Sequence, residues 1–324
     1  MWPELTAVAE QQGGVHTRRQ ALEHGCTPSD IRAATRPGGP WVVVRRGAYA
    51  SRASWQTLDE DARYALLVRS ALLQCSTDAV ASHQSAAVLL GMPMRPRWRL
   101  TVHATRPGVQ GSRRQNGVHV HPARLDPAAC VDDGGIRATG LARAAVDIAR
   151  ERGYEDGVVA CDAALRAGVV ADQLFRVVRS MWAWPGVVAA RAAVRDADGG
   201  AANIGESLTR LLVLELGIGR PETQYEITLG GRTAYADLRV GRHLVEFDGR
   251  IKYLDRGVGG VADIAGHEVL WREKQREDWL RSLGFGISRV VWQDLFGDAR
   301  RRTKARILAE YRETVRRGAL QTSA

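Results

Sequence analysis

The sequence predicts a multidomain α/β protein. The chain has 324 residues, enough for two or three domains. Apolar patterns with a helical period alternate along it with patterns of strand period. A content of 45% hydrophobic and 25% charged residues is typical of a globular chain with a buried core. We expect an N-terminal domain over residues 1–52, a central α/β domain over 53–195, and a C-terminal domain over 200–324, with a linker rich in Ala, Asp and Gly over 189–202.

The first 50 residues carry signals for three short helices and a hairpin. A helix is expected over residues 3–12, Thr17 caps a second helix, and Thr27 caps a third with Pro28 at its first position. Residues 41–50 then have the pattern of a small hairpin. Three short helices followed by such a wing predict a winged helix-turn-helix, which places its third helix against DNA.

The predicted DNA contacts lie on the third helix and on the wing. They are Ser29, Arg32 and Arg36 on the helix and Arg45 and Arg46 on the wing. Arginine and hydroxyl donors at these places suit base edges and phosphate oxygens. The alternative is a winged helix that contacts only protein.

Three features of this segment resemble the N-terminal domain of abortive-infection type IV antitoxins. They are the turn Gly13-Gly14-Val15, the Thr-capped second helix and the wing end Arg46-Gly47-Ala48-Tyr49. The resemblance covers about residues 1–52. It implies binding to double-stranded DNA, commonly at the system's own promoter, and a cognate toxin protein as a candidate partner.

The central third has no catalytic constellation. Helices are expected over residues 58–74, 82–90, 139–150 with Thr139 as the cap, 154–167 and 171–179, and strands over 99–104 and 117–121. The layout is similar to the central region of the same antitoxin family, which implies contact with a partner or spacing of the two ends. His119 and His121 share one strand face and could bind a metal ion, but no third ligand stands near them, which favours ordinary surface or core histidines.

The C-terminal segment alternates between the two periods. Asn203 caps a helix with Glu206 at its third position, and strands follow over residues 223–229, 233–240 and 243–248, then a helix over 267–283, a strand over 287–292 and a basic helix over 298–317. The order is helix, three strands, helix, strand and helix.

The pair Gly241-Arg242 sets the register of the predicted hairpin. A Gly-X pair suits a two-residue type II′ turn, so Val240 pairs with His243. Counting back then places Leu238 opposite Val245 on a face that we expect to be the core. The other face carries the acidic residues.

On that second face the count places carboxylates across from one another. Asp237 opposes Glu246, and Tyr235 opposes Asp248. Like charges directly across a strand pair are destabilising, and a hard cation such as Mg²⁺ or Mn²⁺ between them removes the repulsion. Asp237, Glu246 and Asp248 are therefore candidate metal ligands. The alternative is an ordinary strand pair neutralised by Arg239, Arg242 or Arg250.

Lysine is rare in this chain. Of 46 basic residues only Lys252, Lys274 and Lys304 are lysines. Lys252 follows the acidic residues closely, and an ammonium that can lose a proton supports chemistry that a permanently charged guanidinium cannot. Chance in an arginine-rich sequence is the alternative explanation.

Residues 200–296 resemble the PD-(D/E)XK nuclease superfamily, in particular its very-short-patch-repair-like branch. The resemblance implies an αβββαβ core in which Asp237 and Glu246 hold a catalytic Mg²⁺ or Mn²⁺ ion. It also implies that Glu206 completes the carboxylate set, that Lys252 activates the attacking water, and that the helical segment 273–281 supports the site.

The motif departs from the superfamily pattern in one place. The expected lysine position after Glu246-Phe247 holds Asp248, and the lysine stands at 252 instead. The alternative for Glu206 is a structural role, because a glutamate at the third helical position is explained by the cap at Asn203 alone. Two functions therefore stay open: a metal-dependent endonuclease that hydrolyses DNA phosphodiesters, and an antitoxin-like transcriptional regulator that binds DNA without cleaving it.

Charge and cysteine usage agree with either function. A net charge of +10 and a pI near 10.0 favour a polyanionic partner. The four cysteines form no paired motif, so we expect free thiols in a reducing cytoplasm. No long apolar run is present, which argues against a membrane partner. A homodimer on a palindromic site is a candidate assembly.

Overall fold

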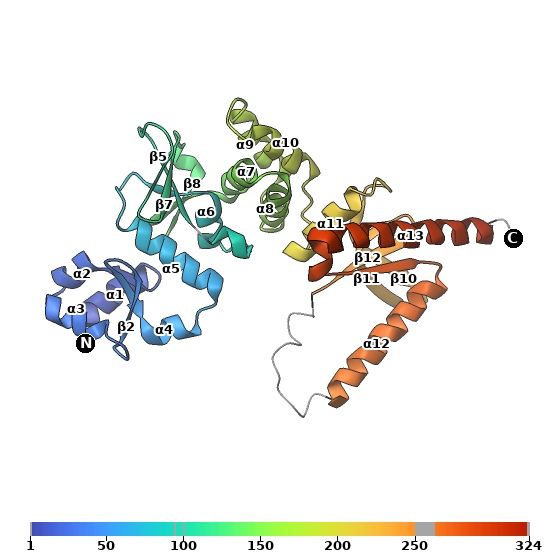
Figure 1. Ribbon diagram of the computed structural model, residues 1–324, viewed down its shortest axis with the longest axis horizontal. Coiled ribbons are helices and arrows are strands. Elements are labelled where there is room, and N and C mark those ends of the chain that lie inside the picture. Colours follow the sequence, from blue (N-terminus) through green and yellow to red (C-terminus); the bar gives the residue numbers. More distant parts are fainter. Residues whose placement is uncertain (1, 94, 100, 250–262, 323–324) are drawn as a thin grey trace. The chain divides into compact units, whose positions relative to one another are not determined.

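The computed structural model describes residues 2–93, 95–99, 101–249 and 263–322. Its described residues form 13 α-helices and three β-sheets, so the fold is mixed α/β as the sequence predicts. The chain divides into two compact units, residues 1–197 and 198–324, which run from blue to green and from yellow to red in Figure 1.

Unit 1 begins with three helices and a three-stranded sheet. The elements are α1 (Pro3–Gln11), β1 (Val15–Thr17), α2 (Arg18–Glu23), α3 (Pro28–Ala34), β2 (Trp41–Arg45) and β3 (Ala48–Ser51). Thr17 and Thr27 cap α2 and α3 through capping boxes with Gln20 and Asp30. The sheet order is β1-β3-β2. Strand β1 was not predicted because its three residues are too short to show a period.

The rest of unit 1 is a six-stranded sheet with helices packed on it. The elements are α4 (Arg52–Thr57), α5 (Glu60–Leu72), β4 (Val80–Ala81), α6 (His83–Leu89), β5 (Val102–Arg106), β6 (Arg113–Gln115), β7 (Val118–Pro122), β8 (Cys130–Asp133), β9 (Ile136–Thr139), α7 (Leu141–Arg152), α8 (Tyr154–Arg166), α9 (Ala171–Ser180) and α10 (Val187–Asp196). The order is β6-β7-β5-β4-β9-β8. Strands β5 and β7 run parallel, with His103 beside His119 and Thr105 beside His121.

The helix predicted over residues 58–74 is present as α5, and Asp59 caps it by accepting the Ala62 N–H at 2.8 Å. Two other predictions about this region are wrong. Thr139 does not cap a helix, since it pairs with Cys130 in the β8–β9 ladder and Gly140 precedes α7. Residues 189–196 of the predicted linker belong to α10, whose small side chains are buried against α7 and α8.

Unit 2 has the predicted order of elements. They are α11 (Ile204–Leu214), β10 (Glu222–Leu229), β11 (Arg232–Val240), β12 (His243–Asp248), α12 (Asp263–Ser282), β13 (Gly286–Val291) and α13 (Gly297–Thr322). The sheet order is β10-β11-β12-β13, and β13 runs parallel to β12 while the other pairs are antiparallel.

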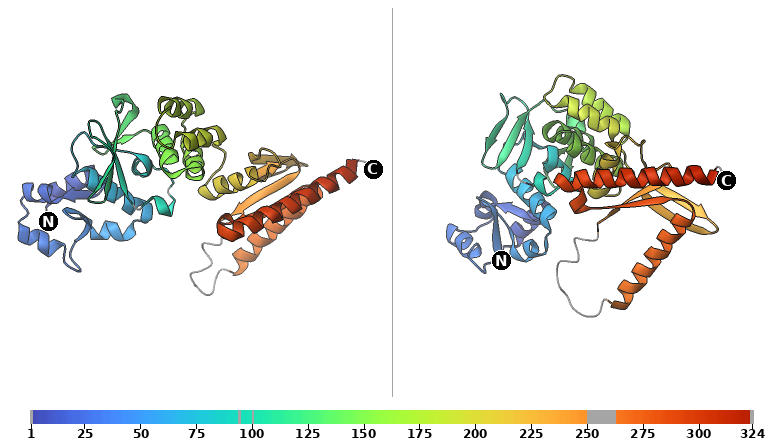
Figure 2. Two further views of the ribbon diagram at one scale, coloured as in Figure 1. Left: turned by 45° about the horizontal axis from the view of Figure 1, so that its top comes forward. Right: turned by 45° about the vertical axis from the view of Figure 1, so that its right-hand side comes forward.

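Both faces of this sheet are covered, as the views in Figure 2 show. On one face Leu280 of α12 packs in a core cluster with Leu244 and Ala236. On the other face His243 contacts Ser288 at 2.8 Å and Thr314 of α13 at 2.9 Å. Helix α12 therefore covers part of the face on which Leu244 lies.

Among the described helices, none is both long and apolar enough to cross a membrane.

Candidate functional site

The hairpin that carries the acidic residues has the predicted turn. Gly241 has φ +58°, and Arg242 is not among the described residues with positive φ, as a type II′ turn requires. The register is also the predicted one, with Val240 beside His243 and Leu238 beside Val245.

The pairing stops before the acidic residues. The β11–β12 ladder ends at Leu238 and Val245. A continued ladder would join the Phe247 N–H to the backbone of Ala236; instead this N–H donates to Asp237 Oδ2 at 2.7 Å. The Asp237 carboxylate therefore lies against the backbone of β12, directly after Glu246. The prediction that Asp237 and Glu246 face each other as ladder neighbours is wrong.

The predicted pair of Tyr235 and Asp248 is not formed either. Tyr235 pairs with Glu226 of β10, and its hydroxyl donates to the Glu226 carboxylate at 3.3 Å. Asp248 ends β12 beside Val291 of β13. It stands two residues after Glu246 and so leaves the strand on the same side. Lys252 lies outside the described residues.

Glu206 is held next to Asp237 by the start of α11. Its carboxylate accepts the Ala202 N–H at 2.7 Å, the Asn203 side-chain amide at 2.6 Å and the Gln224 side-chain amide at 3.1 Å. On β10, Gln224 stands between Thr223 and Tyr225, which pair with Leu238 and Ala236 of β11. Gln224 therefore lies across from Asp237.

A close approach of α11 to β12 accounts for this position. A Cβ atom at residue 205 would lie 2.1 Å from the Phe247 ring, so only glycine lets the first turn of α11 come this near. Phe247 follows Glu246 on β12, and its N–H is the donor to Asp237. The packing of Gly205 on Phe247 thus brings Glu206 to the other two acids.

The three acids interact electrostatically. We call Asp237, Glu246 and Glu206 the carboxylate cluster. The pKa of Asp237 is raised to about 6, mainly by burial. The charges of Glu206 and Glu246 act in the same direction, while the Phe247 N–H and Arg276 act against it. Without a cation, Asp237 therefore gains a proton as pH falls through about 6.

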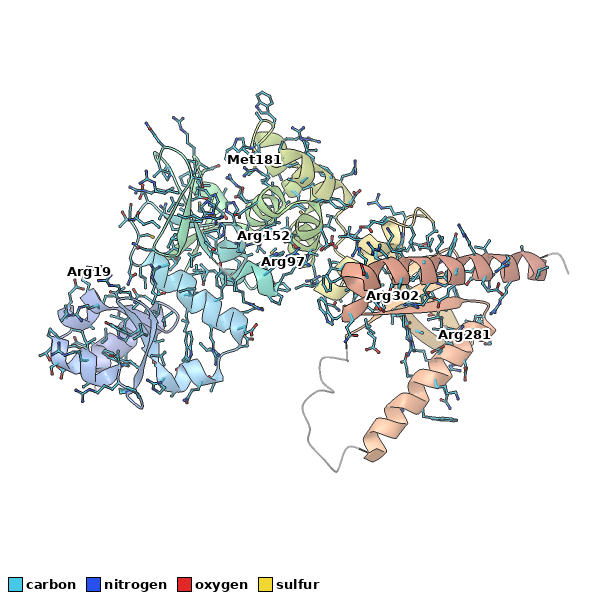
Figure 3. All side chains as sticks on the ribbon, viewed as in Figure 1. Arg19, Arg97, Arg152, Met181, Arg281 and Arg302 are labelled. Carbon is cyan, nitrogen blue, oxygen red and sulfur yellow. The ribbon has the colours of Figure 1, made fainter. Side chains whose placement is uncertain are left out.

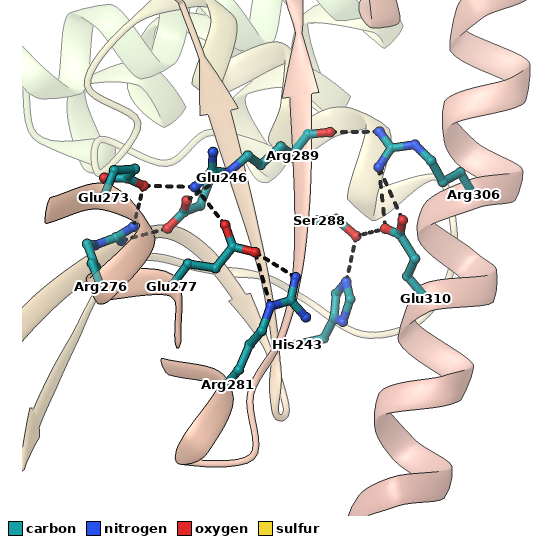
Figure 4. A network of polar contacts seen from close by, with 10 residues as sticks. All are labelled: His243, Glu246, Glu273, Arg276, Glu277, Arg281, Ser288, Arg289, Arg306 and Glu310. Carbon is teal, nitrogen blue, oxygen red and sulfur yellow. Dashed lines mark hydrogen bonds and ion pairs between the residues drawn. The ribbon is translucent and has the colours of Figure 1, made fainter. Parts of the chain in front are cut away.

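Arginines from α12 and β13 contact Glu246, as Figure 4 shows. Arg276 Nη2 donates to Glu246 Oε1 at 2.6 Å, and Arg289 Nε lies 3.9 Å from Glu246 Oε2. Both arginines also contact Glu273, at 3.2 and 2.9 Å. The sequence pointed to the α12 segment as a support of the site, but it did not single out these two arginines.

The alternative to a metal site was neutralisation of the acids by Arg239, Arg242 or Arg250, and the first two of these bind elsewhere. Arg239 donates to the Gly241 carbonyl at 2.7 Å, and Arg242 donates to the Leu283 carbonyl at 2.7 Å. Arg250 lies outside the described residues. Glu246 is therefore neutralised by Arg276 of α12 and by Arg289 of the neighbouring strand β13.

In unit 1 the predicted DNA contacts are mostly exposed. Ser29, Arg32 and Arg36 lie on the exposed side of α3 and its end, and Arg46 is exposed at the β2–β3 turn. Arg45 differs, because it is half-buried and donates to the Asn116 carbonyl at 2.9 Å. Other arginines reach solvent from both units, such as Arg19, Arg281 and Arg302 in Figure 3.

Comparison with known proteins places the chain among mycobacterial relatives. No family model matches it. It is 30% identical over 227 residues to two Mycobacterium tuberculosis proteins, Rv2248 of strain H37Rv and MT2308 of strain CDC 1551, covering 67% of this chain and 76% of each relative. The chain belongs to the Rv2248 family. Both relatives are described as uncharacterized proteins, so the family brings no activity with it.

One solved structure shows a weak similarity. The crystal structure of the Rv2827c protein from Mycobacterium tuberculosis matches with a TM-score of 0.36 and 19% identity, over 64% of this chain and 80% of that one. A similarity at this level supports no conclusion about this member of the Rv2248 family.

The structure of this Rv2248-family chain also brings together residues that sequence reasoning missed. We call them the histidine cluster: His83 of α6, His103 of β5, His121 of β7 and Glu151 of α7. Within the described residues, their ligand atoms all lie within 4.8 Å of one another, a criterion that the carboxylate cluster does not meet. The sequence indicated His121 as a possible ligand but offered no third ligand near it. The pairing of β5 with β7 brings His103 to it.

Proposed function

We propose that this protein binds DNA through its N-terminal helices and hydrolyses DNA phosphodiesters in unit 2, with Mg²⁺ or Mn²⁺ held by the carboxylate cluster. The observation that carries this proposal is the approach of Asp237, Glu246 and Glu206 from three different elements, β11, β12 and α11. The order of helices and strands in unit 2 supports the αβββαβ nuclease-like core that the sequence predicts.

The donor set fits a hard divalent cation. Carboxylate oxygens are the protein ligands that Mg²⁺ prefers. Asp237, crowded by Glu206 and Glu246, is the group that a bound cation would relieve. When bound, such an ion polarises a scissile phosphate and lowers the pKa of a coordinated water.

The chain's own residues would fix the geometry around the scissile phosphate. Three N–H donors hold the Glu206 carboxylate, so its oxygens cannot swing away from Asp237. Arg276 and Arg289 lie beside Glu246, and guanidinium groups bind phosphate oxygens in a bidentate manner. We infer that both arginines orient the DNA backbone at the site.

The N-terminal part supports targeting to DNA. Helices α1 to α3 and the β1-β3-β2 sheet fit the predicted winged helix-turn-helix. The exposed side chains of Ser29, Arg32 and Arg36 on α3 suit a DNA groove. The net charge of +10 favours the same partner.

One observation favours the second function, an antitoxin-like regulator that binds without cleaving. The Arg276–Glu246 ion pair at 2.6 Å already neutralises one acid of the carboxylate cluster. Ion binding therefore requires Glu246 to exchange Arg276 for the cation. A protein that only binds DNA would keep this ion pair permanently.

A plasmid-nicking assay separates the two functions. We expect Mg²⁺-dependent nicking that falls by more than about 100-fold in Asp237→Ala and in Glu246→Ala, because each removes a metal ligand. Glu226→Ala is the matched control, since Glu226 is an exposed carboxylate on the same sheet and should leave the activity unchanged.

A mobility-shift assay at stated salt completes the test. Arg32→Ala with Arg36→Ala should weaken DNA binding without changing the fold. Equal nicking by the wild-type protein and both acidic variants would rule out the carboxylate cluster as the catalytic centre. Binding without any nicking would establish the regulator instead.

A further inference from the structure

We propose that the histidine cluster is a Zn²⁺ site. It lies in unit 1 and is independent of the proposed nuclease centre. The ion would join α6, β5, β7 and α7, and thus two helices and two strands of the central sheet region.

The spacing of the ligand atoms fits tetrahedral coordination. His103 Nδ1 lies 2.9 Å from His121 Nε2 and 3.3 Å from Glu151 Oε2. Zn²⁺ bonds of about 2.0–2.1 Å in a tetrahedron separate neighbouring ligand atoms by roughly 3.4 Å. Three polar atoms therefore already surround a point at which a small cation would contact all of them.

His83 completes the set from α6. Its ring stacks on the His121 ring, with centroids 4.0 Å apart, and its Nδ1 lies 3.0 Å from the buried Ser82 hydroxyl. Because Nδ1 is engaged by Ser82, Nε2 is the atom left for a metal. A hydrogen bond to the second ring nitrogen is the usual way in which a ligand histidine is oriented.

The backbone at His83 is strained, which singles out this residue. Its φ is +53°, a conformation that residues other than glycine rarely adopt. Such conformations persist where the surrounding structure enforces them, and they concentrate at functional sites. The strain places a buried imidazole, 4% exposed, over the His103 and His121 rings.

The protonation state also suits a metal ligand. Burial lowers the pKa of His83, His103 and His121, so these imidazoles are neutral at physiological pH. A neutral imidazole is the form that binds a metal ion.

The surrounding charges balance one another. Arg143 and Arg150 both bind Asp147, at 2.7 and 2.9 Å, so their charges are largely compensated. Arg114 and Arg152 act on the cluster from a greater distance, as electrostatic neighbours of Glu151. The Glu151 side chain is 23% exposed and supplies the negative charge at the site itself.

The chemistry of the ligands selects the ion. Three imidazoles with one carboxylate favour Zn²⁺ and related late transition metals, whereas Mg²⁺ and Ca²⁺ require oxygen ligands. Four protein ligands leave no open position, which is typical of a structural zinc site. A pocket of about 500 Å³, lined by His83, His121 and Glu151, gives the ion a path to the site.

Zinc content measured on the full-length protein tests the proposal. After equilibration with Zn²⁺ and gel filtration, we expect about one Zn²⁺ per chain in the wild type. X-ray absorption should show N/O ligands at about 2.0–2.1 Å. Zinc at 100-fold excess over its Kd should raise Tm by about 5–10 °C.

Variants locate the ion. His121→Gln and Glu151→Gln should each weaken Zn²⁺ binding by at least about 100-fold, with an unchanged far-ultraviolet circular dichroism spectrum. His119 Nδ1 lies 3.6 Å from Glu151 Oε1, but the proposal assigns it no bond to the ion, so His119→Gln should retain Zn²⁺. Asp237→Asn should also retain it, which separates this site from the carboxylate cluster.

Two results would overturn the proposal. The first is a failure of the wild-type protein to bind about one Zn²⁺ per chain. This result does not depend on whether any variant folds. The second is undiminished binding in both His121→Gln and Glu151→Gln, or loss of the ion in Asp237→Asn with retention in those two variants.

Discussion

The two clusters of ligand-type side chains differ in how their charge is handled. In the carboxylate cluster, three acids lie close together and an arginine from α12 neutralises Glu246. In the histidine cluster, burial keeps three rings neutral, so no counter-ion is needed. In the carboxylate cluster, a cation or a proton reduces the repulsion between the acids. In the histidine cluster, the neutral rings can bind a cation at little electrostatic cost. Their responses to pH should therefore have opposite signs.

Among changes at His121, Asp237 and Asn203, the largest effect should come from His121. Burial lowers the pKa of His121 to about 4 in the folded chain. In metal-free protein, the unfolded chain therefore binds the proton at a higher pH than the folded chain does. Stability is then lost between about pH 6.5 and pH 4, by at most about 3 kcal/mol for this residue. His121→Gln should reduce this acid sensitivity in urea unfolding of metal-free protein. An identical pH dependence in the variant would show that the ring is not buried as described.

Asp237 should give the reverse effect, of about 2–3 kcal/mol. Its pKa is raised to about 6, so the folded chain binds the proton more tightly than the unfolded chain, and stability falls as pH rises from about 4 to about 6. Asp237→Asn should thus stabilise the metal-free protein at pH 7–8 and leave it unchanged at pH 4. The difference between variant and wild type isolates this group from His243, whose burial lowers its pKa to about 4 and acts in the opposite direction. A variant less stable than wild type at pH 8 would contradict the crowding of the three acids.

The smallest effect should follow from Asn203→Ala. Asn203 caps α11 by accepting the Glu206 N–H at 3.0 Å and also donates to the Glu206 carboxylate. Loss of the cap should cost about 1 kcal/mol in thermal or urea unfolding. If Glu206 serves the carboxylate cluster, the same change should lower nicking as well. Asp59→Ala, which removes the cap of α5, is the control that should lower stability alone.

The sequence predicts this molecule well wherever the signal is local. Thr17, Thr27 and Asn203 mark their helices through side-chain caps, and Gly241 sets the hairpin register. Each of these signals depends on residues within a few positions of one another.

What the sequence could not show depends on contacts between distant elements. Arg276 reaches Glu246 only because α12 packs on the sheet, and Asp237 captures the Phe247 N–H only where the strands separate. The histidine cluster is the clearest case, since its members come from four elements. His121 gains its partner His103 from the parallel pairing of β5 with β7, which no periodicity in the sequence reveals.

The hydrogen bond from Arg45 to Asn116 has a mechanical consequence. It fastens the tip of the β2–β3 hairpin to the tight turn of Asn116 and Gly117, both at positive φ, from which β7 starts. The same strand then carries His121 toward the other rings. If a duplex bound to the hairpin displaced it, the turn at Asn116 and Gly117 would move with it. An ion in the histidine cluster that restricts β7 would oppose this movement. By thermodynamic reciprocity, whatever free energy the ion adds to duplex affinity, the duplex must add to ion affinity.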